Sequence, residues 1–243
     1  MIELNRKANR LLGRAMHDYK MLADKDRVMI AVSGGVDSLV LFSILKNWQK
    51  KAPISYELLA VHLDMGFGEK EADLVGAQLK RLEANYLIEK TDIGPQAMEV
   101  EDGKSGCFHC SRRRRNRLFE IARENGFTKI AMGHHKEDII ETFYINMMYG
   151  GNLSTMVPRQ DLFKGRLSLI RPMAYLEKKA IKELAGQLKI SPVANPCPLS
   201  GTSKRQEVRD LLESIYEKDE SVKSTIFSSL ANVKPDYLLK TTI

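Results

Sequence analysis

The sequence predicts an α/β protein with a doubly wound parallel sheet, an N-terminal helix and a C-terminal helical extension. Short apolar, β-branched runs alternate with longer helical patterns over most of the chain, as expected of parallel strands joined by crossover helices. A glycine-rich turn stands where the first strand passes into the helix behind it. With 243 residues, 43% of them hydrophobic, the chain can form one large domain and bury a core.

Each element follows from its pattern. Strands are expected at 27–33, 56–63, 86–92, 128–133 and 168–172. Helices are expected between them at 36–50, 69–84, 110–125 and 136–148, and a basic amphipathic helix precedes them at 3–24. After Pro172 the pattern becomes helical, at 177–189, 203–216 and 219–232, while residues 94–106 read as a loop. The chain therefore divides into a basic helix (1–25), a central α/β domain (26–175) and a helical region (176–243).

The bulk composition narrows the class of protein. The net charge of +7 is modest support for a polyanionic partner such as a nucleic acid. No run reaches the ~18 apolar residues that a membrane span needs. The N-terminal residues lack a signal-peptide core, and three cysteines are too few for a disulfide framework. We therefore expect a cytoplasmic protein that does not enter a membrane.

The turn between the first strand and its helix reads Ser-Gly-Gly-Val-Asp-Ser, residues 33–38. A helix start presents free N–H groups and a partial positive charge, and glycines let the backbone approach a phosphate. The string is neither G-x-x-x-x-G-K-[ST] nor G-x-G-x-x-G. From the glycines alone, a plain tight β–α turn is as good an interpretation as an anion site.

The full six-residue string resembles the pyrophosphate loop of the PP-loop ATP pyrophosphatase superfamily. The resemblance implies a Rossmann-like PP-loop fold and a reaction at the α-phosphate of ATP, in which a substrate oxygen accepts AMP and pyrophosphate leaves. It implies that Ser33, Gly34, Gly35 and Ser38 cradle phosphate. Asp37 would hold Mg²⁺ or act as a base. The ATP-binding catalytic domain would then be residues 26–175.

A second strand–turn–helix junction reads Gly-His-His-Lys-Glu-Asp at 133–138. Taken alone, it is most simply a helix start with acids in its first turn and solvated histidines. The string nevertheless resembles the G-H-[HN]-x-D-D-x-x-E-T segment of tRNA-modifying members of the same superfamily, with Glu137 in place of an aspartate. The resemblance adds Gly133, His134 and Asp138 to the nucleotide site, with Asp138 also a catalytic candidate.

Three further residues complete the predicted ATP site. Arg171, which precedes Pro172, matches the arginine of an R-P pair in the family; it is otherwise an ordinary capping arginine. His62 and Asp64 lie at the end of the second strand, at the sheet edge where α/β proteins bind ligands. Both are equally compatible with ordinary core or turn roles.

The three cysteines form a C-x-x-C pair, Cys107 and Cys110, and a distant Cys197 in a proline-rich loop. Spacing alone leaves a zinc site and an iron–sulfur site about equally favoured. Zinc would need a fourth ligand, such as His109 or His135. Three thiolates can instead hold a [4Fe-4S] cluster and leave one iron open to an added ligand.

The run from Cys107 to Arg115, followed by the G-H-H segment, resembles bacterial tRNA 2-thiocytidine synthetases and their 2-thiouridine relatives over nearly the whole chain. The resemblance implies a [4Fe-4S] cluster on the three cysteines beside the ATP site. Two positions depart from the family pattern: Val36 replaces a common lysine, and Ser200 replaces a second cysteine of the late loop. The resulting C-P-L-S form is nearer to the 2-thiouridine relatives, whose terminal zinc-binding cysteine pairs this chain lacks.

Arginines follow the C-x-x-C directly. A helical run of four spreads its charges around the axis, so they cannot all face one partner. A solvated helix face is the simplest interpretation; the resemblance assigns Arg114 a catalytic role. The predicted RNA contacts are Arg112, Arg113, Arg115 and Arg117, with Arg10 and Arg14 of the N-terminal helix.

Together these features predict an ATP-, Mg²⁺- and [4Fe-4S]-dependent tRNA sulfurtransferase that adenylates the C2 oxygen of a pyrimidine, cytidine before uridine, and replaces it with sulfur. Sulfide or a cysteine desulfurase relay would supply the sulfur, and the family resemblance suggests a homodimer. One alternative is a PP-loop sulfur transferase or amide-forming ligase acting on a small molecule. Another, of a different class, is a zinc-stapled RNA-binding module.

Overall fold

The computed structural model describes residues 4–68, 70–101, 103, 105–201 and 203–239. Glu3 and Glu69, the first residues of two expected helices, and residues 102 and 104 of the expected loop lie outside this range. A six-stranded sheet with the order β3-β2-β1-β4-β6-β5 forms the centre of the fold. All neighbouring strands are parallel except β5 and β6. The expected α/β fold with a mostly parallel sheet is confirmed.

The strands are short and most are buried, as their β-branched sequences predict. They are β1 (Asp26–Ala31), β2 (Tyr56–Asp64), β3 (Tyr86–Lys90), β4 (Lys129–Ala131), β5 (Arg159–Leu162) and β6 (Leu167–Ile170). The helices are α1 (Arg6–Asp18), α2 (Val36–Gln49), α3 (Glu71–Arg81), α4 (Ile93–Met98), α5 (Gly106–Glu124), α6 (Lys136–Gly150), α7 (Lys178–Gln187), α8 (Lys204–Tyr216) and α9 (Ser221–Ser229), with a 3-10 turn η1 (Pro235–Tyr237).

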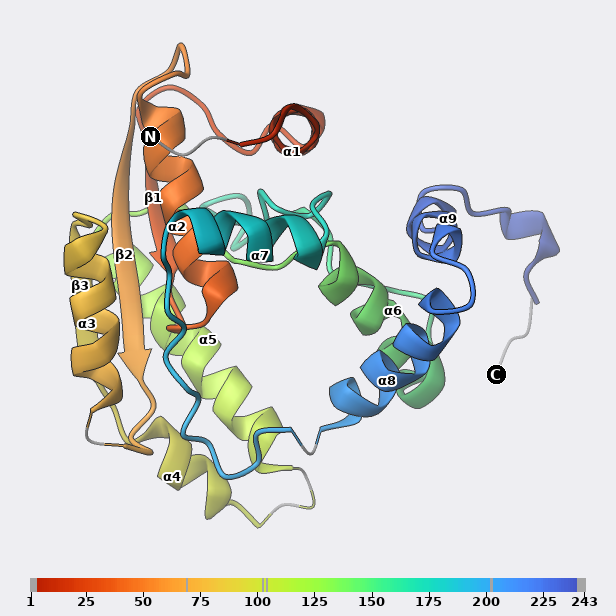
Figure 1. The fold of residues 1–243 in the computed structure, drawn as a ribbon. Helices are drawn as coiled ribbons and strands as arrows, with labels where there is room; N and C mark the ends of the chain where they lie inside the picture. Colours follow the sequence, from red (N-terminus) through yellow and green to blue (C-terminus); the bar gives the residue numbers. More distant parts are fainter. Residues whose placement is uncertain (1–3, 69, 102, 104, 202, 240–243) are drawn as a thin grey trace. The chain divides into compact units, whose positions relative to one another are not determined.

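Helices cover both faces of the sheet. On one face α1, α2, α3 and α7 pack on the strands around fully buried side chains such as Leu12, Leu41 and Ile181. On the other face α5 packs Leu118 and Ile121 against β1, β2, β4 and β6. Figure 1 shows α2 and α7 side by side on the first of these faces. The carboxyl ends of the parallel strands therefore meet at one sheet edge, where ligands bind in such folds.

Four features differ from the sequence expectations. The N-terminal helix expected at 3–24 ends at Asp18, because Tyr19 caps it and Lys20 adopts the left-handed region at φ +46°. Residues expected to form a loop contain α4, because Gly94 fits closely against the Met65 carbonyl and the Phe67 ring. Strand β5 was not expected, because its sequence Arg-Gln-Asp-Leu has no apolar alternation; an edge strand tolerates polar residues. Helix α5 begins at Gly106 rather than at residue 110, because the Ser105 side chain caps it by accepting the Phe108 N–H at 3.3 Å.

The chain forms two compact units that interleave along the sequence. Unit 1 comprises residues 1–135 and 157–200 and contains the sheet; unit 2 comprises 136–156 and 201–243. In unit 2, α6, α8 and α9 pack around Ile140, Val208 and Leu212. The domains expected from the sequence are 1–25, 26–175 and 176–243, and they group residues by motif. The packing groups them differently: α7 packs against the sheet, and α6 packs with the last helices.

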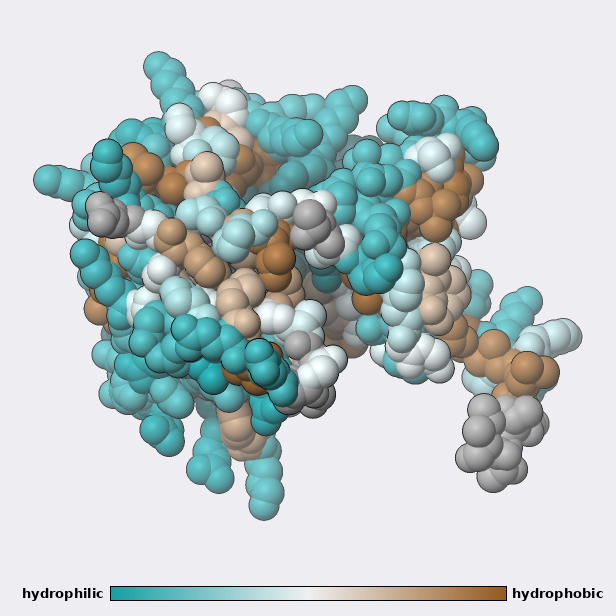
Figure 2. Space-filling model, turned by 90° about the horizontal axis from the view of Figure 1, so that it is seen from below, coloured by the Kyte–Doolittle hydropathy of each residue, from teal (hydrophilic) through white to brown (hydrophobic). Residues whose placement is uncertain are grey.

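The surface carries apolar side chains among hydrophilic ones. On the face seen in Figure 2, hydrophobic residues gather in patches separated by hydrophilic side chains. None of the helices in the described part of the chain combines the length and the apolar character that crossing a bilayer requires.

Candidate active site

The Ser-Gly-Gly turn lies between β1 and α2, as the sequence predicts. Gly34 has φ +82°, and a Cβ there would lie 2.8 Å from the Val75 side chain, so the turn requires glycine at this position. Gly35 is the N-cap of α2 and supplies no side-chain cap. The first N–H groups of α2 therefore remain available to an anion at the carboxyl edge of the sheet.

The two serines of the loop hold its shape. The Ser38 hydroxyl donates to the Gly35 carbonyl at 2.9 Å and accepts the Ser33 N–H at 3.2 Å. The Ser33 hydroxyl, 3.4 Å from that of Ser38, also accepts the Gly35 N–H at 3.4 Å. Ser33 is exposed and Ser38 is buried. Both hydroxyls thus hold the turn, and of the two residues only Ser33 is exposed to solvent.

The second motif packs directly on the first. A Cβ at Gly133 would lie 3.0 Å from the Asp37 carbonyl carbon and from the Ser38 nitrogen. Backbone therefore meets backbone at this point, which only a residue without a side chain permits. The tertiary structure thus brings the Gly-His-His turn against the first turn of α2.

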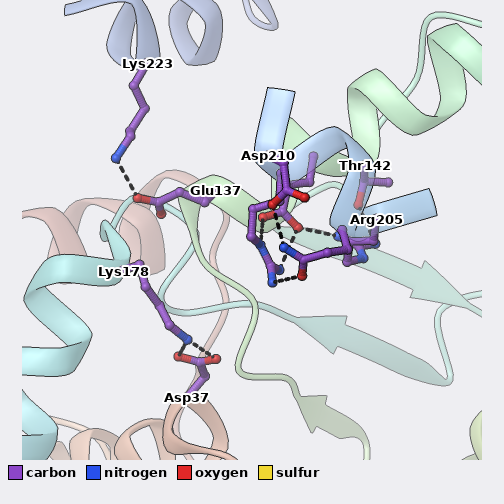
Figure 3. A network of polar contacts seen from close by, with 10 residues as sticks. Asp37, Glu137, Thr142, Lys178, Arg205, Asp210 and Lys223 are labelled. Atoms are coloured by element: carbon purple, nitrogen blue, oxygen red, sulfur yellow. Dashed lines mark hydrogen bonds and ion pairs between the residues drawn. The ribbon is translucent and has the colours of Figure 1, made fainter. Parts of the chain in front are cut away.

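Asp37 has a partner that the sequence analysis missed. The Lys178 ammonium, at the first residue of α7, lies 2.5 and 2.6 Å from the two Asp37 carboxylate oxygens, and both side chains are about one-third exposed. Figure 3 shows the two side chains pointing toward one another. A lysine at a helix N-terminus is unfavourable with respect to the helix dipole, and this local conflict is the signal that could have revealed it.

Arg171 is a buried cation with neutral partners. Its Nε donates to His134 Nδ1 at 3.2 Å and its Nη1 to the Val157 carbonyl at 2.5 Å. Burial, and then the charge of nearby Arg115, lowers the pKa of Arg171 to about 10. A buried guanidinium without a carboxylate partner, in the part of the chain that the structure describes, favours an anionic ligand.

His62 is buried near the carboxyl end of β2. Its Nδ1 lies 2.9 Å from the Val32 carbonyl, which fixes Nδ1 as the donor, and its buried Nε2 has no hydrogen-bond partner among the described residues. Burial lowers the pKa of His62, against the effects of the Val32 hydrogen bond and the Asp64 charge. Asp64 is also buried and accepts the Gly66 N–H at 2.9 Å. A neutral imidazole with an open acceptor suits a ligand that donates a hydrogen bond.

The three cysteines are free thiols, and Cys107 and Cys197 both lie within electrostatic reach of Cys110. Burial raises the pKa of the Cys110 thiol; the charge of Arg114 opposes this effect, while Cys197 and Cys107 add to it. The C-x-x-C pair lies in the first two turns of α5, near the helix N-terminus, where the helix dipole favours thiolates. Within the described ranges, no group of three or more His, Cys, Asp or Glu side chains is close enough to hold a metal ion as it stands.

The segment that carries Cys197 runs along the glycine loop. The Val193 N–H donates to the Gly34 carbonyl at 3.1 Å, and Pro196 lies 3.6 Å from a Cβ built at Gly68. Four residues span at most about 14 Å of extended chain, so Cys197 lies within that reach of the residue bonded to the loop. This contact links the third cysteine to the phosphate loop across more than 150 residues of sequence.

The arginines predicted to contact RNA have different surroundings. Arg112, Arg114 and Arg115 are exposed, while Arg113 donates to the Gln96 side chain at 2.6 Å. The Arg117 guanidinium is held by three carboxylates, those of Glu89, Glu120 and Glu124. In α1, Arg10 and Arg14 are exposed and Arg14 pairs with Asp18 at 3.4 Å.

Arg117 is therefore committed to its glutamates rather than open to phosphate. The remaining arginines of the run leave α5 through different sides of the helix, as their spacing predicts. Arg115 is the one that reaches the neighbourhood of Arg171.

The remaining residues of the second motif bind side chains of α8 and α9 within unit 2. The buried Glu141 carboxylate accepts from Arg205 at 3.1 Å and from Arg209 at 2.9 Å, and Thr142 accepts from Arg205 at 3.2 Å. Glu137 pairs with Lys223 at 3.0 Å, and Figure 3 shows both groups of contacts. The Glu-Thr end of the motif thus fastens α8 to α6. Asp138, in the first turn of α6, lies within electrostatic reach of Arg209.

Comparison with known proteins gives one family. Residues 3–214 match the PP-loop domain family. A tRNA-cytidine(32) 2-sulfurtransferase of Pseudomonas putida is 40% identical over 97% of this chain and 87% of its own length. Proteins of the same name from Shewanella oneidensis and Klebsiella pneumoniae are 39% and 38% identical, over 96% and 97% of this chain and 76% of theirs.

Solved structures share the fold at low sequence identity. The U34-tRNA thiolase NcsA from Methanococcus maripaludis, solved with its [4Fe-4S] cluster, has a TM-score of 0.73 at 19% identity and covers 95% of this chain and 79% of that one. The NH3-dependent NAD synthetase of Campylobacter jejuni has a TM-score of 0.54 at 14% identity and covers 100% of both chains. These likenesses confirm the Rossmann-like PP-loop arrangement of the sheet and its helices.

Proposed function

The chain belongs to the PP-loop family and, within it, to the tRNA-cytidine(32) 2-sulfurtransferases, and from that premise we propose that it converts a tRNA cytidine, at position 32, to 2-thiocytidine with consumption of ATP. The single observation that carries this proposal is the convergence at one sheet edge of the glycine loop, Arg171 and the loop that bears Cys197. A cytosolic location follows from the tRNA substrate.

In the first half of the proposed reaction, ATP binds with its β- and γ-phosphates on the glycine loop and the start of α2. The cytidine C2 oxygen attacks the α-phosphorus, the bond to the β-phosphate oxygen breaks, and pyrophosphate leaves with the electron pair. The Lys178 ammonium, which pairs with Asp37, supports this arrangement because it places a cation at the first turn of α2. Asp37 would hold Mg²⁺ there, while Lys178 and Arg171 would stabilise charge on the phosphates.

The remaining ATP contacts follow from position. Ser33, Gly34 and Gly35 would face the phosphates through a hydroxyl and backbone N–H groups. The open Nε2 of His62 would accept a hydrogen bond from the nucleoside, with Asp64 behind it. Gly133 keeps the second motif close enough for His134 to line the same site. Asp138, at the far end of that motif, would take part in nucleotide binding and catalysis.

In the second half, sulfur replaces the adenylated oxygen at C2 and AMP leaves with that oxygen. Three thiols with no disulfide can hold an iron–sulfur cluster, and the resemblance to a tRNA thiolase solved with its [4Fe-4S] cluster favours this over zinc. Cys107, Cys110 and Cys197 would hold a [4Fe-4S] cluster, which when bound supplies an iron site for the incoming sulfur. Arg114 acts on the Cys110 thiol by its charge and would orient the AMP phosphate or the base.

RNA would be held by the exposed cations outside the site. Arg112 and Arg115 of α5, together with Arg10 and Arg14 of α1, would contact the backbone, and Arg113 would do so after releasing Gln96. Sulfide or a cysteine desulfurase relay would deliver sulfur, and a homodimer would double the RNA-binding surface. The names of the relatives favour cytidine over uridine in spite of Ser200 in the late loop.

The proposal is tested by mass spectrometry of tRNA nucleosides from cells with and without the gene. We expect 2-thiocytidine to disappear in the deletion strain and to return when the gene is supplied, but not when its Asp37→Ala variant is supplied. An unchanged 2-thiocytidine level in the deletion strain would overturn the proposal. A loss of 2-thiouridine instead would indicate that the protein thiolates uridine rather than cytidine.

The cluster assignment has its own readout. Protein prepared without oxygen from iron-replete cells is expected to be brown, with about four irons and four sulfides per chain. Each of the single Cys→Ser variants at 107, 110 and 197 should lose this colour. A colourless wild-type protein that contains one zinc would contradict the assignment while leaving ATP binding untouched.

A further inference from the structure

Unit 1 contains a cavity of about 460 Å³ between the second half of α5 and the turn that joins β5 to β6. The site described above lies at the opposite ends of these elements, because α5 carries Cys107 and Cys110 near its N-terminus and β6 ends next to Arg171. The volume falls in the range that holds small organic ligands. Its lining includes Phe119, Phe127 and Phe163 together with Arg123 and Arg166.

Aromatic rings form one wall of the cavity. Phe119 of α5 and Phe163 of the turn meet edge to face, with ring centroids 5.5 Å apart and an interplanar angle of 85°. Phe163 is 56% exposed, whereas Phe127 is buried. The edge-to-face contact fixes the Phe163 ring while leaving much of it free to stack on another flat group.

The backbone of Phe163 has a positive φ, which is unusual for a bulky residue. Its φ is +51°, and Lys164 and Gly165 follow with φ +59° and +82°. The left-handed region is unfavourable for a bulky side chain, and exposure of the ring is unfavourable as well. Asparagine or glycine would satisfy this turn with less strain. Neither folding nor solubility explains a phenylalanine here, which points to a role for the exposed ring.

The charges at the rim are positive and unpaired. Over the residues that the structure describes, the two arginines that line the cavity, Arg123 and Arg166, form no ion pair. The acid that lines the cavity, Glu120, is bound to Arg117 at 2.9 Å. Flat aromatic surface flanked by free guanidinium groups matches a base with its phosphate.

We propose that this cavity binds an unpaired base of the tRNA substrate, stacked on Phe163, with the adjoining phosphates on Arg123 and Arg166. This inference rests on the proposed function. Phe119 and Arg123 lie 9 and 13 residues beyond Cys110 on the same helix, which is about 14 and 20 Å along its axis. At about 3.4 Å per stacked nucleotide, the bound base lies four to six nucleotides from the target cytidine, within one RNA loop.

The test is RNA affinity of the full chain, measured by fluorescence anisotropy with a labelled 17-nucleotide anticodon stem–loop at fixed salt. Phe163→Asn removes the ring and suits the left-handed backbone, so the variant should be at least as stable as wild type to urea. We expect its Kd to rise about 5- to 150-fold, the usual loss for one stacked base. Phe163→Tyr should bind within about 2-fold of wild type.

Lys189→Asn is the matched control, because it relieves another left-handed position, φ +50°, without removing a ring. A Phe163→Asn variant that binds the stem–loop as wild type does would overturn the inference. Unchanged RNA affinity combined with lower turnover from a cysteine desulfurase, but not from sulfide, would also overturn it and would assign the cavity to a protein partner.

The two proposals fail separately. If wild type binds the stem–loop but forms no 2-thiocytidine, the proposed function fails, and the anisotropy comparison still decides the base pocket. If thiolation proceeds, Phe163→Asn should raise the KM for tRNA much more than it lowers kcat. Equal KM values for the two proteins would contradict the inference alone.

Discussion

The Lys178 ammonium lies 2.5 and 2.6 Å from the two carboxylate oxygens of Asp37, although 141 residues separate them in the chain. An ion pair whose side chains are about one-third exposed contributes at most about 1 kcal/mol to stability. Its value is therefore positional: it brings a cation to the first turn of α2, where the phosphates of ATP would arrive.

Replacing Lys178 by methionine should reduce tRNA-dependent AMP formation by about 100-fold or more, because it removes one fixed positive charge from the developing pyrophosphate. The unfolding free energy should change by less than about 1 kcal/mol. Lys182→Met, on the exposed side of the same helix, is the control and should retain full activity. Equal AMP formation by both variants would exclude Lys178 from the reaction.

Gly133→Ala should destabilise the protein by about 1–3 kcal/mol, because the new methyl group meets the rigid backbone of Asp37 and Ser38 at 3.0 Å. The change should also weaken ATP binding, since it pushes the first turn of α2 out of place. Gly186→Ala, in α7 with open space around it, should be neutral or stabilising by about 0.5–1 kcal/mol. Urea unfolding and ATP titration measure both effects; similar results for the two variants would refute the close approach.

Pyrophosphate should stabilise the wild-type protein, by about 2.7 kcal/mol at 100 times its Kd, because it binds the folded state alone. Arg171→Gln should lose most of this gain at the same concentration, since Arg171 is a buried cation whose pKa burial lowers to about 10. Arg81→Gln, on the exposed end of α3, serves as the control. Thermal shift with and without pyrophosphate measures the difference, and an undiminished shift in Arg171→Gln contradicts an anion site.

Acid should destabilise the protein partly through His62. Burial lowers the pKa of His62 in the folded protein below its ordinary value of 6.5, so the unfolded chain binds the proton more readily. The stability due to this group is therefore present above pH 6.5 and is lost as the pH falls below it. His62→Asn keeps a donor for the Val32 carbonyl and does not titrate. Between pH 8 and pH 5.5 the wild type should lose more unfolding free energy than His62→Asn, and parallel losses would contradict this assignment.

The strand and the turns that form the site can be predicted from local sequence patterns. The apolar run before Ser33 predicts the strand, and the paired glycines predict the turn, which Gly34 at φ +82° requires. The Gly-His-His turn follows by the same rule at β4. Strand β5 and helix α4 escape this reasoning, because an edge strand can be polar and a close backbone approach can stabilise a helix that contains Gly94 and Pro95.

Sequence by itself determined the alternation of strands and helices, the phosphate-binding turn and the presence of three thiols, because these depend on neighbouring residues and on periodic burial. Only the tertiary structure decided that Lys178 meets Asp37, that Arg171 meets His134 and that Val193 fastens the Cys197 loop to Gly34. The physical reason is that such contacts join residues far apart in the chain. Their formation depends on which strands become neighbours in the sheet and on which helices cover each face, and no local pattern records that choice.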